Sequence, residues 1–283
     1  MRIDATTRVC AVIGNPVEHS LSPVLHNTAF ENEGLAICYV AFRVEDLAAA
    51  MAGARALNLL GLSVTIPHKI EILQYLDEVD ETARQIGSVN TVLNRDGKLI
   101  GFNSDGMGAV RALQDAQVPL ADRRILVLGS GGAARAIAFS VGKAAPLREM
   151  ELIGIEKDPC RRLAEDLQRV VPFPVRWHEH TPENLVRAVG RADGIIHCTP
   201  VGMSPHPDAS LIDGRLFRPE QFVFDIVYTP LKTRLLREAE AAGCRIIPGL
   251  EMFLRQAVFQ FECWTGRKAP LDVMREVVLE SLA

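Results

Sequence analysis

The chain has 283 residues, of which 48% are hydrophobic and 23% are charged. This length is too great for one domain of the usual ~100–200 residues and fits two. The 31 basic and 35 acidic side chains give a net charge of −4 with no basic block. The composition therefore argues against a nucleic-acid-binding surface and against a patch for anionic membranes.

Apolar runs of strand length alternate with helical periods along most of the chain. The expected strands cover residues 8–13, 39–44, 60–66, 88–94, 98–102, 125–128, 150–155, 175–178, 194–198, 222–227 and 245–247. The expected helices cover residues 24–33, 46–59, 70–76, 81–86, 109–116, 133–138, 160–170, 183–189, 232–242, 251–264 and 271–282. This alternation predicts an α/β fold with a doubly wound, mostly parallel sheet. Two α/β units are expected to meet near residue 104, with the last helices returning to the first unit.

The sequence also predicts where the protein resides. Its first apolar run, residues 9–13, is too short for the core of a signal peptide. No run approaches the ~18 apolar residues of a membrane helix. The six cysteines are scattered and contain no C-x-x-C pair, so we expect reduced thiols and a cytoplasmic location. No metal is expected, because His178 and His180 lack further ligands that would complete a recognisable site.

A glycine-rich turn follows the strand that ends at Leu128. Gly129, Gly131 and Ala134 match the spacing G-x-G-x-x-G/A, and strong helix formers follow. The first glycine permits a tight turn, the second lets backbone approach a pyrophosphate, and the small third residue lets helix pack on strand. The free N–H groups at the helix N-terminus favour an anion. Glycines alone would also fit a tight turn of purely steric origin.

The next strand strengthens the interpretation of this turn. It ends at Glu156, close to the ~20 residues downstream at which such folds place a ribose-binding carboxylate. Turn and carboxylate together predict a dinucleotide site.

Further polar side chains are expected at strand ends and in strand-to-helix loops, where such folds bind ligands. They are Ser20, Ser22, Thr65, Lys69, Asn90, Asp105, Tyr228 and Gln256. Each has a structural alternative. Ser22 before Pro23 suits a helix N-cap, and Lys69 suits a solvated first turn. Asp105 suits a helix cap, Asn90 suits strand-end backbone groups, and Gln256 suits a packed helix face.

Several short motifs resemble the shikimate dehydrogenase family. They run in order from Cys10 to Gly266 and are jointly specific. They are residues 19–23 (His-Ser-Leu-Ser-Pro), 64–69 (Val-Thr-Ile-Pro-His-Lys), 87–91 (Gly-Ser-Val-Asn-Thr), 103–105 (Asn-Ser-Asp), 129–133 (Gly-Ser-Gly-Gly-Ala), 199–203 (Thr-Pro-Val-Gly-Met), 225–230 (Asp-Ile-Val-Tyr-Thr-Pro) and 249–252 with Gln256.

The resemblance implies two α/β domains. Residues 1–104, completed by 250–283, would form the substrate-binding catalytic domain, and residues 105–249 a Rossmann-type NAD(P)-binding domain. It also implies reversible reduction of 3-dehydroshikimate to shikimate, a step toward chorismate and the aromatic amino acids. The small-molecule partner would be this cyclic hydroxy acid. The oligomeric state is not readable from the residues, and a homodimer is kept as the candidate assembly.

Site roles follow from the same resemblance, position by position. Ser20 and Ser22 match the hydroxyls that hold the substrate carboxylate. Thr65, Asn90, Tyr228 and Gln256 match further substrate contacts, and Lys69 and Asp105 match the catalytic pair. The implied cofactor-binding residues are Gly129, Ser130, Gly131, Gly132, Ala133, Glu156, Lys157, Thr199, Val201, Ile226 and Gly249.

The chemistry of Lys69 and Asp105 agrees with these roles. Hydride delivery to a carbonyl makes an alkoxide, which needs a positioned proton donor. A lysine ammonium can donate this proton, and its amine can take it back during oxidation. Partial burial would lower the lysine pKa, whereas a nearby carboxylate would raise it. We therefore assign Asp105 to orienting Lys69 and binding a substrate hydroxyl.

The sequence departs from the family at the second dinucleotide strand. The commonest members carry Asn-Arg-Thr there, and the arginine binds the 2′-phosphate of NADP. This chain has Glu156, Lys157 and Asp158 instead. A carboxylate accepts hydrogen bonds from a free ribose diol and repels a phosphate, while Lys157 lacks the arginine fork. Between NAD and NADP, we therefore expect NAD to be preferred.

Other departures leave the substrate less certain than the reaction. Some branches with an acidic residue at this position oxidise quinate as well as shikimate, so a quinate or dual-specificity enzyme is the first alternative. Ser104 replaces the usual threonine, Ser63 the usual asparagine, and Glu251 a frequent glycine. A non-catalytic sensor of dinucleotide and carboxylic acid is the alternative from another class. The Lys69–Asp105 pair speaks against it, because a sensor needs no proton donor.

Overall fold

The computed structural model describes residues 3–282, and they form two compact units. Unit 1 runs to Ser104 and resumes at Leu254, and unit 2 runs from Asp105 to Phe253. The boundary expected at residue 250 coincides with the start of helix α9 (Gly249–Thr265). The boundary between the two units lies four residues later, between Phe253 and Leu254, inside this unbroken helix.

Unit 1 is built on a mixed six-stranded sheet in the order β2-β1-β3-β5-β6-β4. β1 runs parallel to β2 and β3, and β5 runs antiparallel to β3 and β6. A tight turn joins β5 and β6, with Asp96 and Gly97 both at positive φ as such a hairpin requires. The strands are β1 (Arg8–Gly14), β2 (Ile37–Arg43), β3 (Gly61–Val64), β4 (Glu78–Val79), β5 (Thr91–Arg95) and β6 (Lys98–Phe102).

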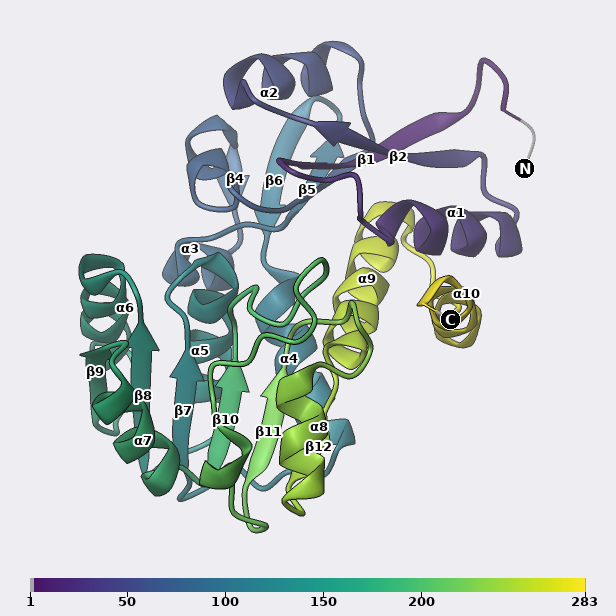
Figure 1. Ribbon diagram of the computed structural model, residues 1–283. Coiled ribbons are helices and arrows are strands. Elements are labelled where there is room, and N and C mark those ends of the chain that lie inside the picture. Colours follow the sequence, from purple (N-terminus) through teal and green to yellow (C-terminus); the bar gives the residue numbers. More distant parts are fainter. Residues whose placement is uncertain (1–2, 283) are drawn as a thin grey trace. The chain divides into compact units, whose positions relative to one another are not determined.

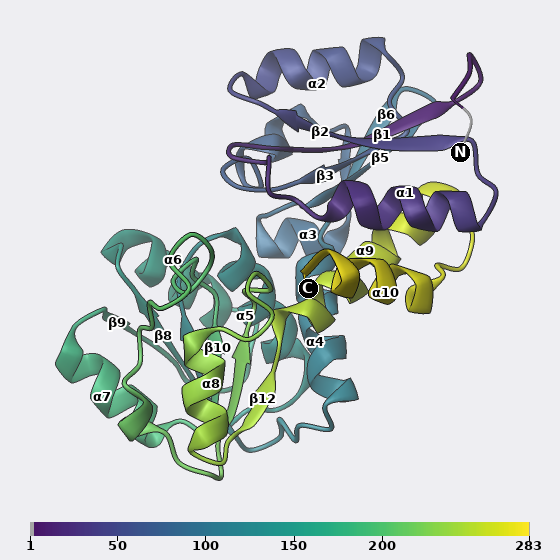
Figure 2. The same ribbon diagram turned by 45° about the vertical axis from the view of Figure 1, so that its right-hand side comes forward.

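Helices cover both faces of this sheet. α2 (Leu47–Ala56) packs its Leu47, Met51 and Ala54 against β1 and β3. α1 (Ser22–Asn32), α10 (Leu271–Leu282) and the last turns of α9 lie on the other face (Figure 2). There Trp264 donates its indole N–H to the carbonyl of Val92 at 3.0 Å. A Cβ on Gly61 would lie 2.1 Å from that indole, so only glycine fits beneath it.

Unit 2 has an all-parallel sheet in the order β12-β11-β10-β7-β8-β9. From the other edge this is the 3-2-1-4-5-6 order of a dinucleotide-binding fold. The predicted doubly wound sheet is thereby confirmed. α7 and α8 pack on one face and α5 on the other (Figure 1). The strands are β7 (Arg124–Leu128), β8 (Glu149–Gly154), β9 (Val175–Glu179), β10 (Gly194–His197), β11 (Phe222–Asp225) and β12 (Arg245–Ile247). The helices are α4 (Ser104–Asp115), α5 (Gly132–Ala144), α6 (Lys157–Gln168), α7 (Pro182–Arg191) and α8 (Arg234–Ala241), together with the start of α9.

Several local elements differ in detail from those expected. The helix expected after Lys69 is present as a 3₁₀ helix, η1 (Glu71–Tyr75); of its side chains only Ile72 is buried. The strand expected from residue 88 begins at Thr91. The short elements β4 and η2 (Gly214–Leu216) were not predicted, and α3 covers Glu81–Ile86 as expected. Within residues 3–282, no helix combines the length and apolar character needed to cross a membrane.

The N-cap that was the structural alternative for Ser22 does not form. α1 begins at Ser22 itself, and Leu21 occupies the cap position without a side-chain hydrogen bond. The hydroxyl of Ser20 accepts the backbone N–H of Ser22 at 3.3 Å. Ser20 therefore supplies the acceptor that a capping side chain would otherwise supply.

Candidate functional site

The glycine-rich turn of unit 2 has the geometry expected for binding a phosphate. Gly129 adopts φ +117°, and a Cβ there would lie 3.0 Å from the carbonyl oxygen of Cys198. Gly131 is the N-cap of α5 and has no side-chain cap. A Cβ on Gly131 would meet no atom within 4 Å, which leaves open space beside the first N–H groups of the helix. An anion such as a pyrophosphate fits there.

The end of β8 presents the carboxylate that the sequence predicted. Glu156 is exposed and is the N-cap of α6, but its side chain makes no capping hydrogen bond. Lys157, the next residue, forms an exposed ion pair with Glu179 at 3.3 Å. The Lys157 ammonium is thus directed toward a carboxylate of the protein. Ser130 approaches the same strand end, since a Cβ on Gly154 would lie 3.0 Å from its hydroxyl.

Two more predicted cofactor segments lie at the carboxyl ends of the parallel strands. A Cβ on Gly129 would lie 3.3 Å from the methyl group of Thr199, so the 199–201 loop packs over the glycine-rich turn. Gly249 approaches Ile226 so closely that a Cβ would lie 2.4 Å from its carbonyl oxygen. Unit 2 therefore gathers the turn, Thr199 and Ile226 at one edge of its sheet.

Asn90 of unit 1 is held by the start of α4. The Asn90 side chain is 2% exposed, and its Oδ1 accepts the backbone N–H of Ser104 at 2.8 Å. The same oxygen accepts the hydroxyl of Thr91 at 2.9 Å. Asn90 thereby caps α4 from a distance, and this contact explains why α4 begins at Ser104 and not at residue 109 as expected.

A buried polar chain continues from Asn90 into the core of unit 1. It consists of Tyr39, Ser63, Gln260, Thr91, Asn90 and Ser104. The phenol of Tyr39 donates to Ser63 at 2.6 Å, and Ser63 donates to Oε1 of Gln260 at 2.9 Å. The amide of Gln260 donates to Thr91 at 3.1 Å. Gln260 was missed at the sequence level, although it lies one helical turn after Gln256.

The remaining polar residues of unit 1 surround the end of β3. Thr65 and Lys69 are half-buried, and the Lys69 carbonyl accepts the N–H of Val89 at 2.8 Å. A Cβ on Gly14 would lie 2.3 Å from the Thr65 methyl group, which ties β1 to this loop. The ring of the buried His68 bonds the carbonyl of Val44 at 2.9 Å and holds this loop in place.

The last three predicted site residues belong to α4, α9 and the loop after β11. Asp105 is 6% exposed in the first turn of α4, where the helix dipole favours its charge. The ring of Tyr228 stacks on Phe253 at 4.5 Å between centroids, and burial raises the pKa of its phenol. Gln256 is buried on α9 within unit 1.

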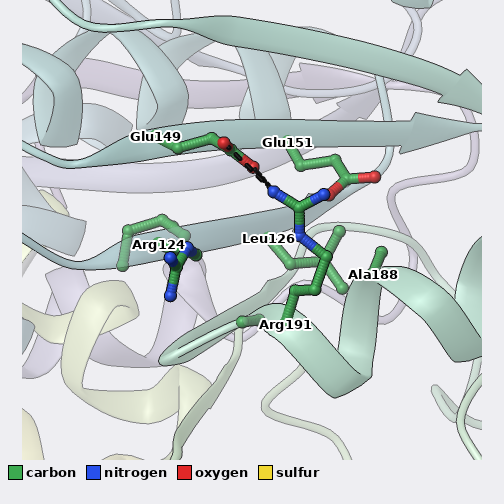
Figure 3. A pocket seen from close by; sticks show the side chains of 8 residues that line it. Arg124, Leu126, Glu149, Glu151, Ala188 and Arg191 are labelled. Carbon is green, nitrogen blue, oxygen red and sulfur yellow. Dashed lines mark hydrogen bonds and ion pairs between the residues drawn. The ribbon is translucent and has the colours of Figure 1, made fainter.

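A small pocket lies near the amino ends of β7 and β8, away from the carboxyl ends of the strands. None of the predicted site residues lines it. Glu149 and Glu151 of β8 point toward Arg191 of α7 there (Figure 3). Arg191 bonds both carboxylate oxygens of Glu149, at 3.0 and 3.3 Å. These ion pairs close the start of β8 against α7 and leave the carboxyl ends of the strands free for ligands.

Family models match both parts of unit 1. Residues 12–92 match the shikimate dehydrogenase substrate binding domain, and residues 249–279 match the shikimate 5′-dehydrogenase C-terminal domain. A shikimate dehydrogenase (NADP(+)) of Symbiobacterium thermophilum is 44% identical over 280 residues, covering 97% of this chain and 95% of the relative. The chain belongs to the shikimate dehydrogenase family.

Solved structures agree with this membership. A shikimate 5-dehydrogenase from Listeria monocytogenes, in complex with shikimate and NAD, is 35% identical with a TM-score of 0.89. It covers 98% of each chain. A quinate dehydrogenase from Corynebacterium glutamicum, in complex with NAD, has the same TM-score at 28% identity, covering 97% of this chain and 99% of the other. The resemblance stated from the motifs is thus confirmed, and with it the assignment to an oxidoreductase family.

Proposed function

We propose that the protein is a nicotinamide-dependent dehydrogenase that interconverts shikimate and 3-dehydroshikimate. The observation that carries the proposal is the similarity to a shikimate dehydrogenase over 97% of the chain. The polar residues of the 64–69 and 87–91 motifs stand at the strand ends of unit 1, where they support substrate binding. Quinate is not favoured, since the quinate dehydrogenase is the more distant relative at 28% identity.

Each half of the site would contribute part of the chemistry. The nicotinamide supplies or accepts the hydride when the cofactor is bound. Gly129 and the start of α5 would hold its pyrophosphate. Lys69 would donate a proton to the carbonyl oxygen during reduction, and its amine would take the proton back from the hydroxyl during oxidation. Asp105 would orient Lys69 and accept a hydrogen bond from a ring hydroxyl.

The other polar groups would fix the substrate. Ser20 and Ser22 would donate hydroxyl hydrogen bonds to its carboxylate, as the family resemblance implies. Thr65, Asn90, Tyr228 and Gln256 would bind the ring hydroxyls and the same carboxylate. Asn90 is held in place for this role by Ser104 and Thr91, which both donate to its Oδ1.

We propose that NAD is preferred over NADP. The exposed Glu156 carboxylate would accept hydrogen bonds from a free ribose diol, and it would repel a 2′-phosphate. Lys157 would compensate little, because its ammonium pairs with Glu179. We expect Glu156→Gln to raise kcat/KM for NADP about tenfold relative to NAD. Asp158→Asn is the matched control, and an unmutated protein that prefers NADP would refute the proposal.

One set of initial rates tests both substrate and cofactor. Shikimate and quinate are each measured with NAD and with NADP. We expect the highest kcat/KM for shikimate with NAD. No turnover with any of the four pairs, despite cofactor binding, would favour the alternative of a non-catalytic sensor.

The compartment and assembly belong to the same proposal. All six cysteines are free thiols, which supports a reducing cytoplasm. A homodimer is the assembly proposed, and sedimentation of the full chain tests it.

A further inference from the structure

Three neighbouring strands of unit 2 end at the same level. Leu128 of β7 pairs with His197 of β10, and His197 pairs with Asp225 of β11. Because the strands are parallel, their carboxyl ends bring His197 and Asp225 beside the turn that begins at Gly129. The pairing of His197 with Asp225 was not predicted from the sequence.

A buried hydrogen-bond network joins these strand ends. His197 is 1% exposed and Asp225 is fully buried. Nδ1 of His197 lies 2.8 Å from Oδ1 of Asp225, and Nε2 lies 2.5 Å from the hydroxyl of Thr199. Asp225 also accepts the hydroxyl of Thr233 at 2.6 Å and the backbone N–H of Val227 at 3.0 Å.

The chemistry of these groups fixes the hydrogen bond between His197 and Asp225. The Asp225 carboxylate can only accept, so Nδ1 of His197 carries the proton that it shares with Asp225. The other ring nitrogen, Nε2, bonds the hydroxyl of Thr199. The same hydroxyl accepts the N–H of Val201 at 3.2 Å. The position of Thr199 is therefore set from the strand ends.

We propose that His197 and Asp225 are positioning residues for the nicotinamide cofactor, acting through Thr199 and the 199–201 loop. The loop packs over Gly129, with the Thr199 methyl group 3.3 Å from a Cβ built there. A displaced Thr199 would change the wall of the cofactor site while leaving unit 1 untouched. The inference rests on the proposed function for the identity of the cofactor.

Two variants separate the two ends of the network. His197→Asn keeps a donor toward Asp225 but is too short to reach Thr199. Asp225→Asn replaces the carboxylate with a neutral amide, which keeps only one of the two acceptor oxygens that hold His197, Thr233 and Val227. We expect each variant to raise the dissociation constant of reduced cofactor at least fivefold. We also expect the KM for shikimate to stay within twofold.

The measurement is a fluorescence titration of each full-length variant with NADH and with NADPH, in the absence of substrate. This readout does not depend on which hydroxy acid is the substrate, so it can fail separately from the proposed function. His206→Asn, an exposed histidine outside the network, is the control and should bind like the unmutated protein. A purely structural role would lower the melting temperature and leave cofactor affinity unchanged, which would overturn the proposal.

Thr199→Val keeps the experiment decisive if the buried variants do not fold. This variant removes only the Thr199 hydroxyl, through which His197 contacts the 199–201 loop. We expect Thr199→Val alone to raise the dissociation constant of reduced cofactor at least fivefold. Where His197→Asn also folds, the double variant should show no further weakening. Additive effects of the two substitutions, or unchanged affinity in Thr199→Val, would refute the positioning role.

Discussion

The side-chain oxygen of Asn90 accepts the backbone N–H of Ser104 at 2.8 Å, and the next residue in the chain is Asp105. One contact thus fixes both a predicted substrate contact and the first turn of the helix that carries a predicted catalytic carboxylate. Asn90 is itself tied to Gln260 through Thr91. The precision of the site therefore depends on core residues that contact no ligand.

Gln260→Leu tests this dependence. The substitution removes the acceptor of Ser63 and the donor to Thr91, both of which are buried. Unpaired buried polar groups cost about 1–3 kcal/mol, so we expect the free energy of unfolding to fall by about that amount. We also expect the KM for shikimate to rise severalfold. Urea denaturation and steady-state rates provide the two measurements.

Tyr39→Phe is the matched control for Gln260→Leu. It removes one hydroxyl at the far end of the same chain, the donor to Ser63. The expected loss is about 0.5–1.5 kcal/mol with little change in KM. If Gln260→Leu were as stable as the unmutated protein, the polar chain would not support the site.

Lys69→Met tests the proposed proton donor. The substitution keeps a long apolar stem and removes the ammonium. General acid–base groups contribute about 10²–10⁴-fold to rates, so we expect kcat to fall by that factor. The KM for shikimate should change little, because the lost interaction develops in the transition state.

Lys69→Arg distinguishes proton transfer from simple charge. Arginine keeps the positive charge but does not release its proton near neutral pH. We therefore expect kcat of Lys69→Arg to be nearly as low as that of Lys69→Met. Lys98→Met, which removes an exposed lysine paired with Glu78, should behave as the unmutated protein. Near-normal turnover in Lys69→Arg would instead assign Lys69 an electrostatic role.

Local features of the fold were predictable from the sequence, because short-range sterics determine them. The turn at Gly129 and the hairpin at Asp96-Gly97 each need backbone at positive φ, which only a few residue types tolerate. The alternation of strands and helices likewise predicted the doubly wound, mostly parallel sheet that unit 2 contains. In each case the deciding residues lie within a few positions of one another.

Features that depend on distant partners were not predictable. α4 begins five residues earlier than expected because its cap, Asn90, lies 14 positions away. The pair His197–Asp225 spans 28 positions and depends on strand register. Within the candidate site, single positions could be named from motifs, but the hydrogen bonds that orient them could not.

Arg191→Met tests the ion pairs at the far edge of the unit 2 sheet. The Glu149 side chain is 11% exposed and receives Arg191 at 3.0 Å, with Arg176 further away at 3.6 Å. Removing Arg191 leaves a mostly buried carboxylate with one weak, exposed partner. We expect the free energy of unfolding to fall by about 1–2 kcal/mol. This is less than for a fully buried pair, because Arg191 is itself half-exposed and solvent screens its charge.

Arg215→Met is the matched control for Arg191→Met. Its ion pair with Asp213 lies on the surface, with the arginine side chain 89% exposed. Solvent and salt screen such a pair, so we expect no measurable loss in the free energy of unfolding. Both variants should keep normal kcat and KM, because neither residue is at the carboxyl ends of the strands. A change in cofactor KM for Arg191→Met would mean that this edge communicates with the site.

His26 predicts how stability depends on pH. Its ring is fully buried between Tyr39 and Trp264, at 4.6 and 5.2 Å between centroids. Burial lowers the pKa of His26 from 6.5 to about 3. Between these two values the folded protein binds fewer protons than the unfolded chain. The contribution of neutral His26 to the free energy of unfolding is therefore fully present above pH 6.5, and it is lost as the pH falls toward 3.

His26→Phe removes this titration while keeping an aromatic ring in the stack. At pH 5 the unfolded chain gains about 2 kcal/mol from protonating His26, at 1.36 kcal/mol for each pH unit below its ordinary pKa. Urea unfolding at pH 7 and pH 5 should show that the unmutated protein loses about 2 kcal/mol more than His26→Phe. His206→Gln, at an exposed histidine, should keep the full loss. Equal losses in the unmutated protein and His26→Phe would mean that His26 does not titrate differently on folding.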